Sequence, residues 1–440
     1  MVSPPRSVRQ IAERLESAGF ETWCVGGAVR DALLGHPHLD WDLATSATPD
    51  QVRKLFRRTV PVGLDFGTVG VLDDVGVMHE ITTFRRDVHT DGRHAVVEFG
   101  ASLDDDLARR DFTINAIAVS PKTGEIRDPF GGREDLERRL VRAVGVPDER
   151  MREDRLRALR AIRFASRLAF DIDDETWNAI VRSAPHLPRL SRERVKQEIE
   201  KTMEQVKCPS RAFALWQSSG ALDALVPALA KQEDIAFASA DHVGLPGGSR
   251  RAERTDARRS HRVLSLFLGI QSDRVRAALH DLRFSNADTR TMTKLAEHWT
   301  VLFEPVSHAL GTGGAITDAA IRRWAAATGR TQLAGFFRVA EARWAAMRSA
   351  GIPAPSRETA SSVYRRALRI AYRDPIELAD LSVDGEDLQG IAQGRALGKI
   401  LRALLDWVVE DPSRNVRDQL LEEAARLARQ INGGAGGAER

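Results

Sequence analysis

Two hydrophobic patterns follow one another along this chain. In the first 143 residues, short apolar runs such as 23–25, 69–72 and 77–83 are separated by polar turns, which is typical of strands. Beyond about residue 144, apolar side chains recur with helical spacing instead. These helical stretches are 153–169, 174–183, 191–206, 211–219, 315–348 and 396–430. The pattern predicts an α+β protein with a mixed N-terminal sheet and an all-helical remainder.

The first 60 residues predict a strand, a glycine turn, a helix and a second strand. Residues 7–18 have helical periodicity, and the apolar run 23–25 predicts a strand that leads through two glycines into a helix at 28–34. A second strand is expected at 39–44. A threonine followed by a proline is typical of a helix start, which predicts a further helix over 49–56.

Length and composition indicate a soluble protein of several domains. Because 440 residues exceed what one core supports, about two to four domains are expected. No apolar run approaches ~18 residues, and the first residues lack the apolar segment of a signal peptide, so neither a membrane span nor export is expected. Cys24 and Cys208 are the only cysteines, which excludes a disulfide framework and suits the reducing cytoplasm.

The distribution of charge says more about partners than the formal net charge of +3 does. Arginines crowd two segments, 152–167 and 250–262. Arginine-rich surfaces suit the phosphates of nucleic acids. The simpler explanation is a solvated helix face with carboxylate partners such as Glu253 and Asp256. For the second segment both explanations stay open.

Candidate chemistry begins with Gly26, Gly27, Arg30, Asp40 and Asp42. The glycines fall between a predicted strand and a predicted helix, so backbone amides and the helix N-terminus can face a triphosphate. Arg30 lies one turn into that helix and could reach the same oxygens. Asp40 and Asp42 are alternate residues of an extended segment and therefore point to one side. Two such carboxylates can hold a divalent metal against a nucleoside triphosphate, which predicts nucleotidyl transfer.

Each of these features alone has a simpler explanation. A glycine pair is usually an ordinary turn, and aspartates near strand ends commonly form local turns or helix caps. Glu80, within the predicted strand 77–83, is a candidate third carboxylate that could orient metal or accept a proton from an attacking hydroxyl. An exposed strand residue is the alternative for Glu80. The combination, rather than any single residue, is what points to a nucleotidyl-transfer site.

Four more motifs follow the Gly26–Asp42 segment. They are DLARRDFTINA at 106–116, DPFGGREDL at 128–136, EDRLRALRAIRFA at 153–165 and SRERVKQEIEK at 191–201. In this order the five resemble motifs of the bacterial-type (class II) CCA-adding tRNA nucleotidyltransferases and the related poly(A) polymerases. They resemble that family's metal-binding, ribose and phosphate-binding, head-to-neck connecting, nucleotide-selecting and last neck motifs. The resemblance covers about residues 20–210. The rest of the chain has only a general helical pattern, which does not indicate a family.

The resemblance implies a domain organisation and an activity. It implies a polymerase-β-like catalytic head at 1–143, a helical neck that selects nucleotides at 144–210, a helical body at 211–310, a tRNA-binding helical tail at 311–430 and a disordered end at 431–440. The implied reaction adds C, C and A to the tRNA 3′ end from CTP and ATP, with Mg²⁺ and without a nucleic-acid template. The implied partner is tRNA, held at its acceptor end and elbow; no protein partner is indicated.

The resemblance also implies roles for individual residues. Asp40 and Asp42 would bind the metal and, together with Glu80, take part in catalysis. The residues implied to bind nucleotide are Gly26, Gly27, Arg30, Arg110, Asp111, Asn115, Asp154, Arg157, Arg160 and Arg163. For Arg109 an ordinary surface charge is the alternative.

Residue spacing is compatible with base selection by the protein. Arg157, Arg160 and Arg163 recur every third residue and form a row along a helix, beside an apolar row that can anchor it. Asp154 lies one turn before Arg157, so a carboxylate and a guanidinium can face one base edge. Cytosine and adenine each offer an amine beside a ring nitrogen, whereas guanine and uracil would leave buried groups unpaired. An ion pair between Asp154 and Arg157 within the helix is the alternative.

Three other functions stay open: an A-adding enzyme, a poly(A) polymerase and a catalytically silent RNA-binding protein. The polar segment 83–95 predicts a mobile loop, and it resembles the loop that assists the change from C to A addition in the family, which favours complete CCA addition. The presence of both Asp40 and Asp42 argues against a silent binder.

Overall fold

The chain folds into two compact units. The computed structural model describes residues 3–36, 40–90, 95–244 and 251–434. The first unit comprises Met1–Lys207 and Arg211–Pro227, and the second comprises Cys208–Ser210 and Ala228–Arg440. The finer division expected at residues 143, 210 and 310 stays a prediction. Within the described ranges, no helix is long and apolar enough to cross a membrane.

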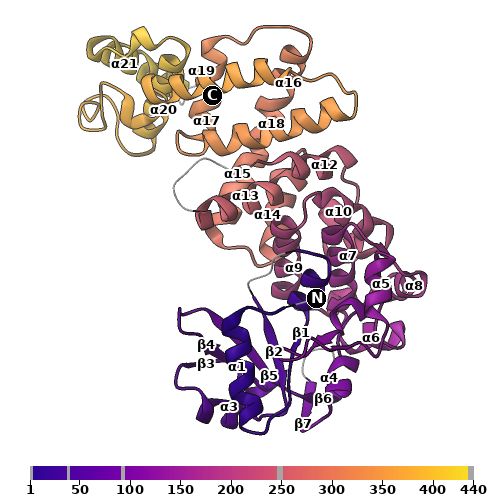
Figure 1. Cartoon of the computed structure of the whole chain (residues 1–440). Coiled ribbons are helices and arrows are strands. Elements are labelled where there is room, and N and C mark those ends of the chain that lie inside the picture. The colour runs from indigo at the N-terminus through magenta and orange to yellow at the C-terminus, as the bar shows by residue number, and fades with distance from the viewer. Residues whose placement is uncertain (1–2, 37–39, 91–94, 245–250, 435–440) are drawn as a thin grey trace. The chain divides into compact units, whose positions relative to one another are not determined.

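Among the described residues, a seven-stranded mixed sheet forms the N-terminal part of the first unit (Figure 1). The strand order is β3-β4-β5-β2-β1-β8-β9. Strands β2 and β5 are parallel, and the other paired neighbours are antiparallel. The strands are β1 (Thr22–Val25), β2 (Asp42–Thr45), β3 (Thr59–Gly63), β4 (Thr68–Leu72), β5 (Met78–Thr83), β8 (Ala118–Val119) and β9 (Ile126–Arg127). The predicted mixed sheet is confirmed.

One face of this sheet is apolar and covered by helices. Successive side chains of a strand point to opposite faces, and Val71 and Ile81 are fully buried on the covered side. Helix α3 (Pro49–Leu55) contacts β4 and β5, and helix α1 (Arg6–Ser17) contacts β1 and α3. Thr48 caps α3 as its sequence predicts, and the structure adds a capping box with Gln51. The other face of the central strands is more polar and lines the candidate site.

Two predicted elements near the site differ from expectation. Strand β2 begins at Asp42, so Asp40 precedes the strand rather than lying within it, and residues 37–39 lie outside the described residues. In the segment 83–95, which was expected to be a mobile loop, residues 85–90 form strand β6 (Arg85–Thr90), which pairs antiparallel with β7 (Ala95–Phe99). Residues 91–94 of this segment lie outside the described residues. Its polar composition hid this pairing, because a two-stranded ribbon needs no buried face to form backbone hydrogen bonds.

Helices make up most of the first unit outside the sheet. Helices α7 and α9 pack on each other, and Leu156, Leu159 and Ile162 of α7 are buried as the predicted apolar row requires. Two short strands, β10 (Leu140–Val141) and β11 (Asp171–Ile172), pair in parallel, and β11 lies in the region where only helices were expected. The helices besides α1 and α3 are α2 (Gly27–Leu33), α4 (Leu103–Ala108), α5 (Gly132–Glu137), α6 (Pro147–Glu153), α7 (Leu156–Leu168), α8 (Asp174–Ser183), α9 (Arg192–Gln205), α10 (Pro209–Ser218) and α11 (Ala221–Leu225).

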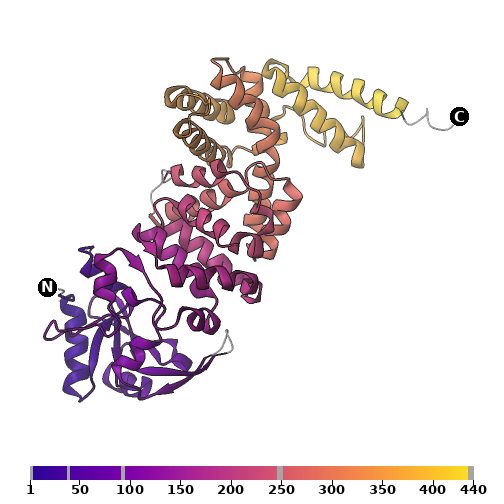
Figure 2. The same cartoon turned by 90° about the vertical axis from the view of Figure 1, so that its right-hand side faces the viewer.

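The described part of the second unit contains helices and no strand. Helices α20 and α21 pack side by side (Figures 1 and 2). The helical pattern at 315–348 divides into α17 and α18 at Gly329, whose φ of +87° ends α17. The helices are α12 (Asp234–His242), α13 (Arg251–Leu266), α14 (Ser272–Asp281), α15 (Asn286–His298), α16 (Glu304–Gly311), α17 (Asp318–Thr328), α18 (Leu333–Ser349), α19 (Arg357–Arg373), α20 (Gly394–Glu410) and α21 (Arg417–Gly434).

Two sequence expectations fall on this unit. Helix α21 continues through Gly434, into the segment assigned to a disordered end, and residues 435–440 lie outside the described residues. In the second arginine-rich segment, Arg262 is fully buried and Arg258 donates from Nε to the carbonyl oxygen of Val243 at 3.0 Å. These two arginines therefore serve packing inside the unit rather than forming a solvated or phosphate-binding face.

Candidate active site

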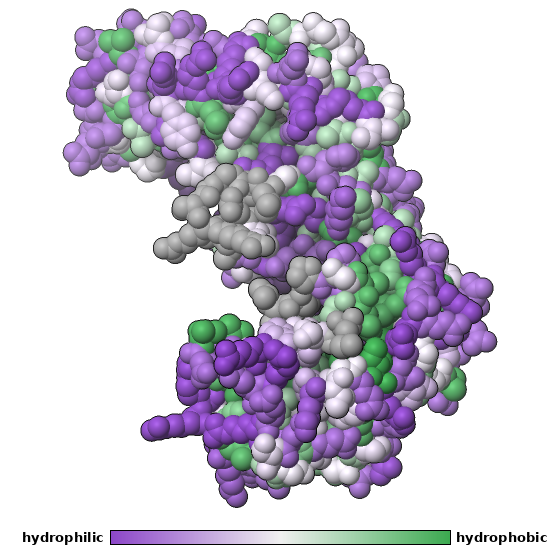
Figure 3. Space-filling view, viewed as in Figure 1, coloured by the Kyte–Doolittle hydropathy of each residue, from purple (hydrophilic) through white to green (hydrophobic). Residues whose placement is uncertain are grey.

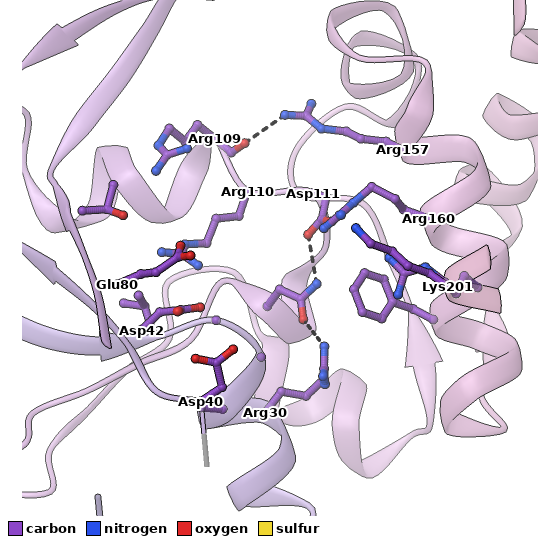
Figure 4. A pocket seen from close by; sticks show the side chains of 18 of the residues that line it. Arg30, Asp40, Asp42, Glu80, Arg109, Arg110, Asp111, Arg157, Arg160 and Lys201 are labelled. Carbon is purple, nitrogen blue, oxygen red and sulfur yellow. Dashed lines mark hydrogen bonds and ion pairs between the residues drawn. The ribbon is translucent and has the colours of Figure 1, made fainter. Parts of the chain in front are cut away.

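A cavity of about 550 Å³ in the first unit brings the sequence-predicted residues together. One wall comes from the sheet, the other from helices α7 and α9, and the loop after α4 lies between them (Figure 4). Every residue implied by the motifs contributes to the lining. They are Gly26, Gly27, Arg30, Asp40, Asp42, Glu80, Arg110, Asp111, Asn115, Asp154, Arg157, Arg160 and Arg163.

Carboxylates gather on the sheet wall. Asp42 begins β2 and Glu80 lies on the parallel neighbour β5, with Asp40 two residues before Asp42 (Figure 4). Burial, reinforced by the charges of Asp40 and Glu80, raises the pKa of Asp42 to about 7. Burial and the charge of Asp40 also raise the pKa of Glu80. Burial and mutual repulsion thus disfavour the ionised forms of Asp42 and Glu80. A bound cation would offset this repulsion, so the wall favours cation binding.

A divalent cation fits this wall through the chemistry of its donors. Within the described residues, no group of three histidine, cysteine, aspartate or glutamate side chains is close enough to form a ready-made metal cage. Asp40 and Asp42 offer hard oxygen ligands, which divalent cations such as Mg²⁺ accept in ones and twos while keeping waters or phosphate oxygens for the other positions. An open two-carboxylate site suits a metal that is shared with a bound triphosphate.

The glycine turn lets two side chains approach the backbone closely. Gly26 has a φ of +78°, a left-handed conformation that favours glycine, and α2 begins at the next residue. A Cβ at position 26 would lie 3.1 Å from Nη1 of Arg110 and 3.6 Å from Oδ2 of Asp42. The missing side chain therefore keeps open the space between Arg110 and the carboxylate wall.

Arg110 and Arg109 share one buried anchor. Oδ2 of Asp106 accepts from Arg110 at 3.1 Å, and Oδ1 accepts from Arg109 at 2.7 Å. Asp106 is fully buried, and although burial by itself would raise its pKa, the two arginines keep that pKa below the ordinary value. Arg109 is therefore part of the cavity wall rather than an ordinary surface charge.

A chain of hydrogen bonds crosses the floor of the cavity from the glycine-turn helix to α7. Arg30 donates to Oδ1 of Asn115 at 2.6 Å, and Asn115 donates to Asp111 at 2.9 Å. Arg160 donates twice to Oδ2 of Asp111, at 2.9 and 2.7 Å. Arg30 also binds Asp31 at 2.6 Å, within the buried interior. The guanidinium of Arg30 thus orients Asn115 instead of pointing at the carboxylate wall (Figure 4).

Asp154 and Arg157 are held by different partners. Asp154 accepts from the backbone N–H of Leu156 at 3.1 Å and from Arg194 at 2.7 Å. Arg157 donates to Glu153 at 2.6 Å and to the carbonyl oxygen of Arg109 at 3.0 Å. Among the described residues, Asp154 and Arg157 are therefore ion-paired to Arg194 and Glu153 rather than to each other. Both side chains remain in the cavity wall with fixed orientations.

Arg163 contributes to the cavity lining, but its guanidinium is bonded to residues of α9. Its Nε donates to Glu198 at 2.7 Å and its Nη1 donates to Gln205 at 3.1 Å. The side chains of Arg163 and Glu198 are both almost completely buried. This geometry joins α7 to α9, so Arg163 supports the position of neighbouring residues.

The motifs missed several lining residues, and Phe164 is the most informative. The guanidinium groups of Arg30, Arg160 and Arg163 lie 5.1, 5.4 and 4.6 Å from the centre of its ring. These cation–π contacts place Arg30 of α2 and Arg160 and Arg163 of α7 around one buried ring. In the sequence, Phe164 could be recognised only as an apolar residue of the motif at 153–165. The other unassigned lining residues include Thr68, Thr82, Arg85, Arg167, Lys201 and Gln205.

Two family models match segments within the first 233 residues. A model of the poly(A) polymerase head domain matches residues 22–142, and one of the probable RNA- and SrmB-binding site of polymerase A matches residues 169–233. The CCA-adding enzyme of Geobacillus kaustophilus is 43% identical over 256 residues, which are 58% of this chain and 62% of that protein. That of Geobacillus stearothermophilus is 44% identical over 243 residues, 54% of this chain and 59% of that one. The chain thus aligns with less than two thirds of the length of these curated relatives.

Solved structures extend the similarity over nearly the whole chain. The Bacillus stearothermophilus CCA-adding enzyme in complex with CTP is 31% identical, with a TM-score of 0.73 over 98% of both chains. The Thermotoga maritima CCA-adding enzyme complexed with tRNA shares the fold at 19% identity, with a TM-score of 0.62 over 95% of this chain and 94% of that one. With 31% identity over 98% of both chains and matching head and RNA-binding models, this chain belongs to the family of CCA-adding enzymes and poly(A) polymerases.

Proposed function

We propose that this protein adds C, C and A to the 3′ end of tRNA from CTP and ATP, without a nucleic-acid template. The observation that carries the proposal is the cavity in which Asp40 and Asp42 stand opposite the wall formed by Asp154 and Arg157. A metal-binding wall facing a base-reading wall is the minimum that template-free nucleotidyl transfer requires. Relatives of the same family are solved with CTP, with ATP and with tRNA.

Mg²⁺ is the cation that Asp40 and Asp42 would hold. The family's nucleotidyl transfer depends on a divalent metal, and two carboxylates beside a triphosphate are typical ligands for Mg²⁺. When bound, the cation polarises the α-phosphate and makes the attacking 3′ hydroxyl more acidic. Glu80, with its raised pKa, is placed on the same wall to orient this group or to take up the hydroxyl proton.

The glycine turn and Arg110 would hold the triphosphate. Gly26 and Gly27 line the cavity at the start of α2, and Arg110 approaches Gly26 closely. Arg30 acts through Asn115, since its donors already reach Asn115 and Asp31. Asn115 and Asp111, fixed by Arg30 and Arg160, would then position the sugar.

Asp154 and Arg157 would read the base. Arg194 and the Leu156 amide keep the Asp154 carboxylate in one orientation, and Glu153 does the same for Arg157. A fixed acceptor can take the amine of cytosine or adenine, while a fixed guanidinium donates to the ring nitrogen. Guanine and uracil would leave these partners unpaired, at a cost of about 1–3 kcal/mol for each buried group. Arg160 and Arg163 support this pair from the same helix.

The reaction step is a displacement at the α-phosphorus. The tRNA 3′ oxygen forms the new bond to phosphorus, the bond between that phosphorus and the α–β bridging oxygen breaks, and pyrophosphate leaves with the bond's electron pair. The hydroxyl proton passes to Glu80 or to water. The helical second unit would grip the tRNA elbow through backbone contacts, by shape rather than by sequence. We place this activity in the cytoplasm, where tRNA and free thiols such as Cys24 and Cys208 coexist.

One assay tests the proposal: tRNA that ends before CCA is incubated with Mg²⁺ and with CTP, ATP or both. The expected result is addition of two C residues from CTP alone and of a final A when both nucleotides are present. An Asp42→Asn variant is the control and should transfer nothing while binding tRNA. Incorporation restricted to tRNA that already ends in CC would instead identify an A-adding enzyme.

The matching head and RNA-binding models are described as poly(A) polymerase modules, which makes poly(A) polymerase the second candidate. It would extend unrelated RNA with long A tails in the same assay. Tight RNA binding without any incorporation would identify a silent RNA-binding protein.

A further inference from the structure

The sheet face that carries Glu80 continues beyond the cavity toward the edge of the sheet. Glu80 of β5 pairs with Gly70 of β4, and Gly70 pairs with Val60 of β3. Residues paired across neighbouring strands share a face. Thr68 and Thr82, which line the cavity, are paired on the same face and their hydroxyl oxygens lie 3.0 Å apart. The catalytic face therefore runs without interruption onto β3.

The continuation of this face is apolar and open to solvent. A Cβ at Gly70 would lie 2.8 Å from Sδ of Met78 and 2.9 Å from Cγ2 of Val62. These two side chains thus close over Gly70 on the same face as Val60. Val60, Val62 and Met78 are all exposed. Exposed apolar side chains that gather on one strand face indicate a surface that something covers.

Two phenyl rings extend the surface at the β3–β4 connection. Phe66 is 45% exposed and Phe99, from β7, is 40% exposed. A Cβ at Gly67, which has a φ of +76°, would lie 2.5 Å from Cε1 of Phe99, so that ring rests directly on the glycine next to Phe66. Figure 3 shows hydrophobic side chains gathered over the β3–β4 hairpin. We call Val60, Val62, Phe66, Met78 and Phe99 the apolar face.

Arg85 connects the apolar face to the cavity. Its side chain lines the cavity, and its guanidinium lies 5.8 Å from the centre of the Phe66 ring. Arg85 also donates to the carbonyl oxygen of Phe66. A nucleic acid that leaves the carboxylate wall on this side meets a cation first and aromatic rings next, which is the combination that binds single-stranded nucleic acid.

We propose that the apolar face binds the nucleobases at the 3′ end of the RNA that receives the new nucleotide. This inference rests on the proposed function, which requires the 3′ hydroxyl at Asp40 and Asp42. The incoming base is read on the opposite wall by Asp154 and Arg157, so the acceptor strand lies over the sheet. Its terminal base changes with every addition. Stacking on phenyl rings tolerates this change, because every base has an aromatic face.

The experiment measures equilibrium binding of an acceptor-stem hairpin RNA that ends before CCA, using Phe66→Ala and Phe99→Ala variants. We expect each variant to raise the Kd for this RNA about tenfold, the loss typical of one base–aromatic contact. The KM for CTP should change less than about twofold, because a stacking surface for RNA makes no contact with the incoming nucleotide. Val181→Ala, an exposed apolar residue on α8 of the same unit, is the matched control and should leave both constants unchanged.

A second RNA, identical but abasic at its 3′-terminal nucleotide, identifies the contact. The wild-type protein should bind the abasic RNA about tenfold more weakly than the complete RNA. Phe66→Ala should bind the two RNAs with nearly equal affinity, because ring and base form one contact. Equal Kd values for wild type and both variants would overturn the inference. A tenfold loss of affinity for the abasic RNA that persists in Phe66→Ala would overturn it as well. Either result would point to a protein partner for the apolar face instead. Binding is measured without turnover, so failure to transfer nucleotides would refute the proposed function separately.

Discussion

Arg194 of α9 binds the carboxylate of Asp154, at the start of α7, across 2.7 Å. The second oxygen of Asp154 accepts from the backbone N–H of Leu156, the first residue of α7. Both oxygens are therefore oriented before any nucleotide binds. The residue that would read the base amine depends on a partner 40 positions away in the chain.

Arg194→Ala should weaken base selection. Without its partner, Asp154 can rotate about its side-chain bonds, so the acceptor is no longer fixed opposite the base amine. We expect kcat/KM for CTP to fall about tenfold, equivalent to the loss of about 1.4 kcal/mol of transition-state stabilisation. Misincorporation of UTP should rise relative to CTP. Arg182→Ala, which breaks the exposed pair with Asp148, is the control. Unchanged selectivity in the Arg194 variant would remove Arg194 from this role.

The pair Arg163–Glu198 should matter for stability more than for nucleotide binding. Both side chains are buried and joined at 2.7 Å. Arg163→Met would leave Glu198 buried without its main partner, which typically costs about 3–5 kcal/mol. A double variant, Arg163→Met with Glu198→Leu, should recover most of this loss. Arg182→Met at the exposed Arg182–Asp148 pair should cost less than about 1 kcal/mol. Denaturant unfolding measures all three; an Arg163→Met variant of wild-type stability would contradict this assignment.

Two adjacent glycines in the DPFGG motif should differ in their tolerance of alanine. A Cβ at Gly132 would lie 2.2 Å from the carbonyl oxygen of Thr113, which belongs to the same helical turn as Asn115 of the site. Gly131 has a φ of +71°, but a Cβ there would meet nothing within 4 Å, so its substitution costs only the left-handed conformation, about 1–2 kcal/mol. Gly132→Ala should therefore destabilise more than Gly131→Ala and also raise KM for CTP. Equal thermal unfolding midpoints for the two variants would refute this difference.

Local chemistry made much of this site predictable. The strand, glycine turn and helix around Gly26 follow from short-range preferences, and the same holds for the capped start of α3 at Thr48. The apolar row of α7 predicted that Leu156, Leu159 and Ile162 are buried. Each of these features is encoded within a few residues, so a single sequence contains the signal.

Partners distant in sequence were not predictable in the same way. Arg194 was available as a charge, but nothing local says that it binds Asp154, which lies 40 positions away in the chain. The direction of Arg30 toward Asn115 likewise depends on how the loop after α4 packs on α2. These contacts arise from tertiary packing, which spacing along the chain does not contain.

The raised pKa of Asp42 predicts a pH-dependent stability for the metal-free protein. Burial, with the charges of Asp40 and Glu80, raises this pKa from 3.8 to about 7. Between these values the folded state binds more protons than the unfolded state, so this group lowers the free energy of unfolding as pH rises through the window. The slope is at most about 1.4 kcal/mol per pH unit. Above about pH 7 the full penalty is present, and below about pH 4 it is absent.

Asp42→Asn should remove this dependence. In EDTA-treated protein, the unfolding midpoint of wild type should fall between about pH 5 and pH 8 by more than that of Asp42→Asn, because the amide neither titrates nor repels Asp40 and Glu80. Adding Mg²⁺ at the upper end of this range should raise the wild-type midpoint and leave the variant nearly unchanged, because a cation offsets the carboxylate repulsion only where Asp42 is ionised. Asp148→Asn, at an exposed carboxylate, controls for a general loss of negative charge. Parallel pH profiles of wild type and Asp42→Asn would show that Asp42 is already ionised at the acidic end and that its proton does not compete with the metal.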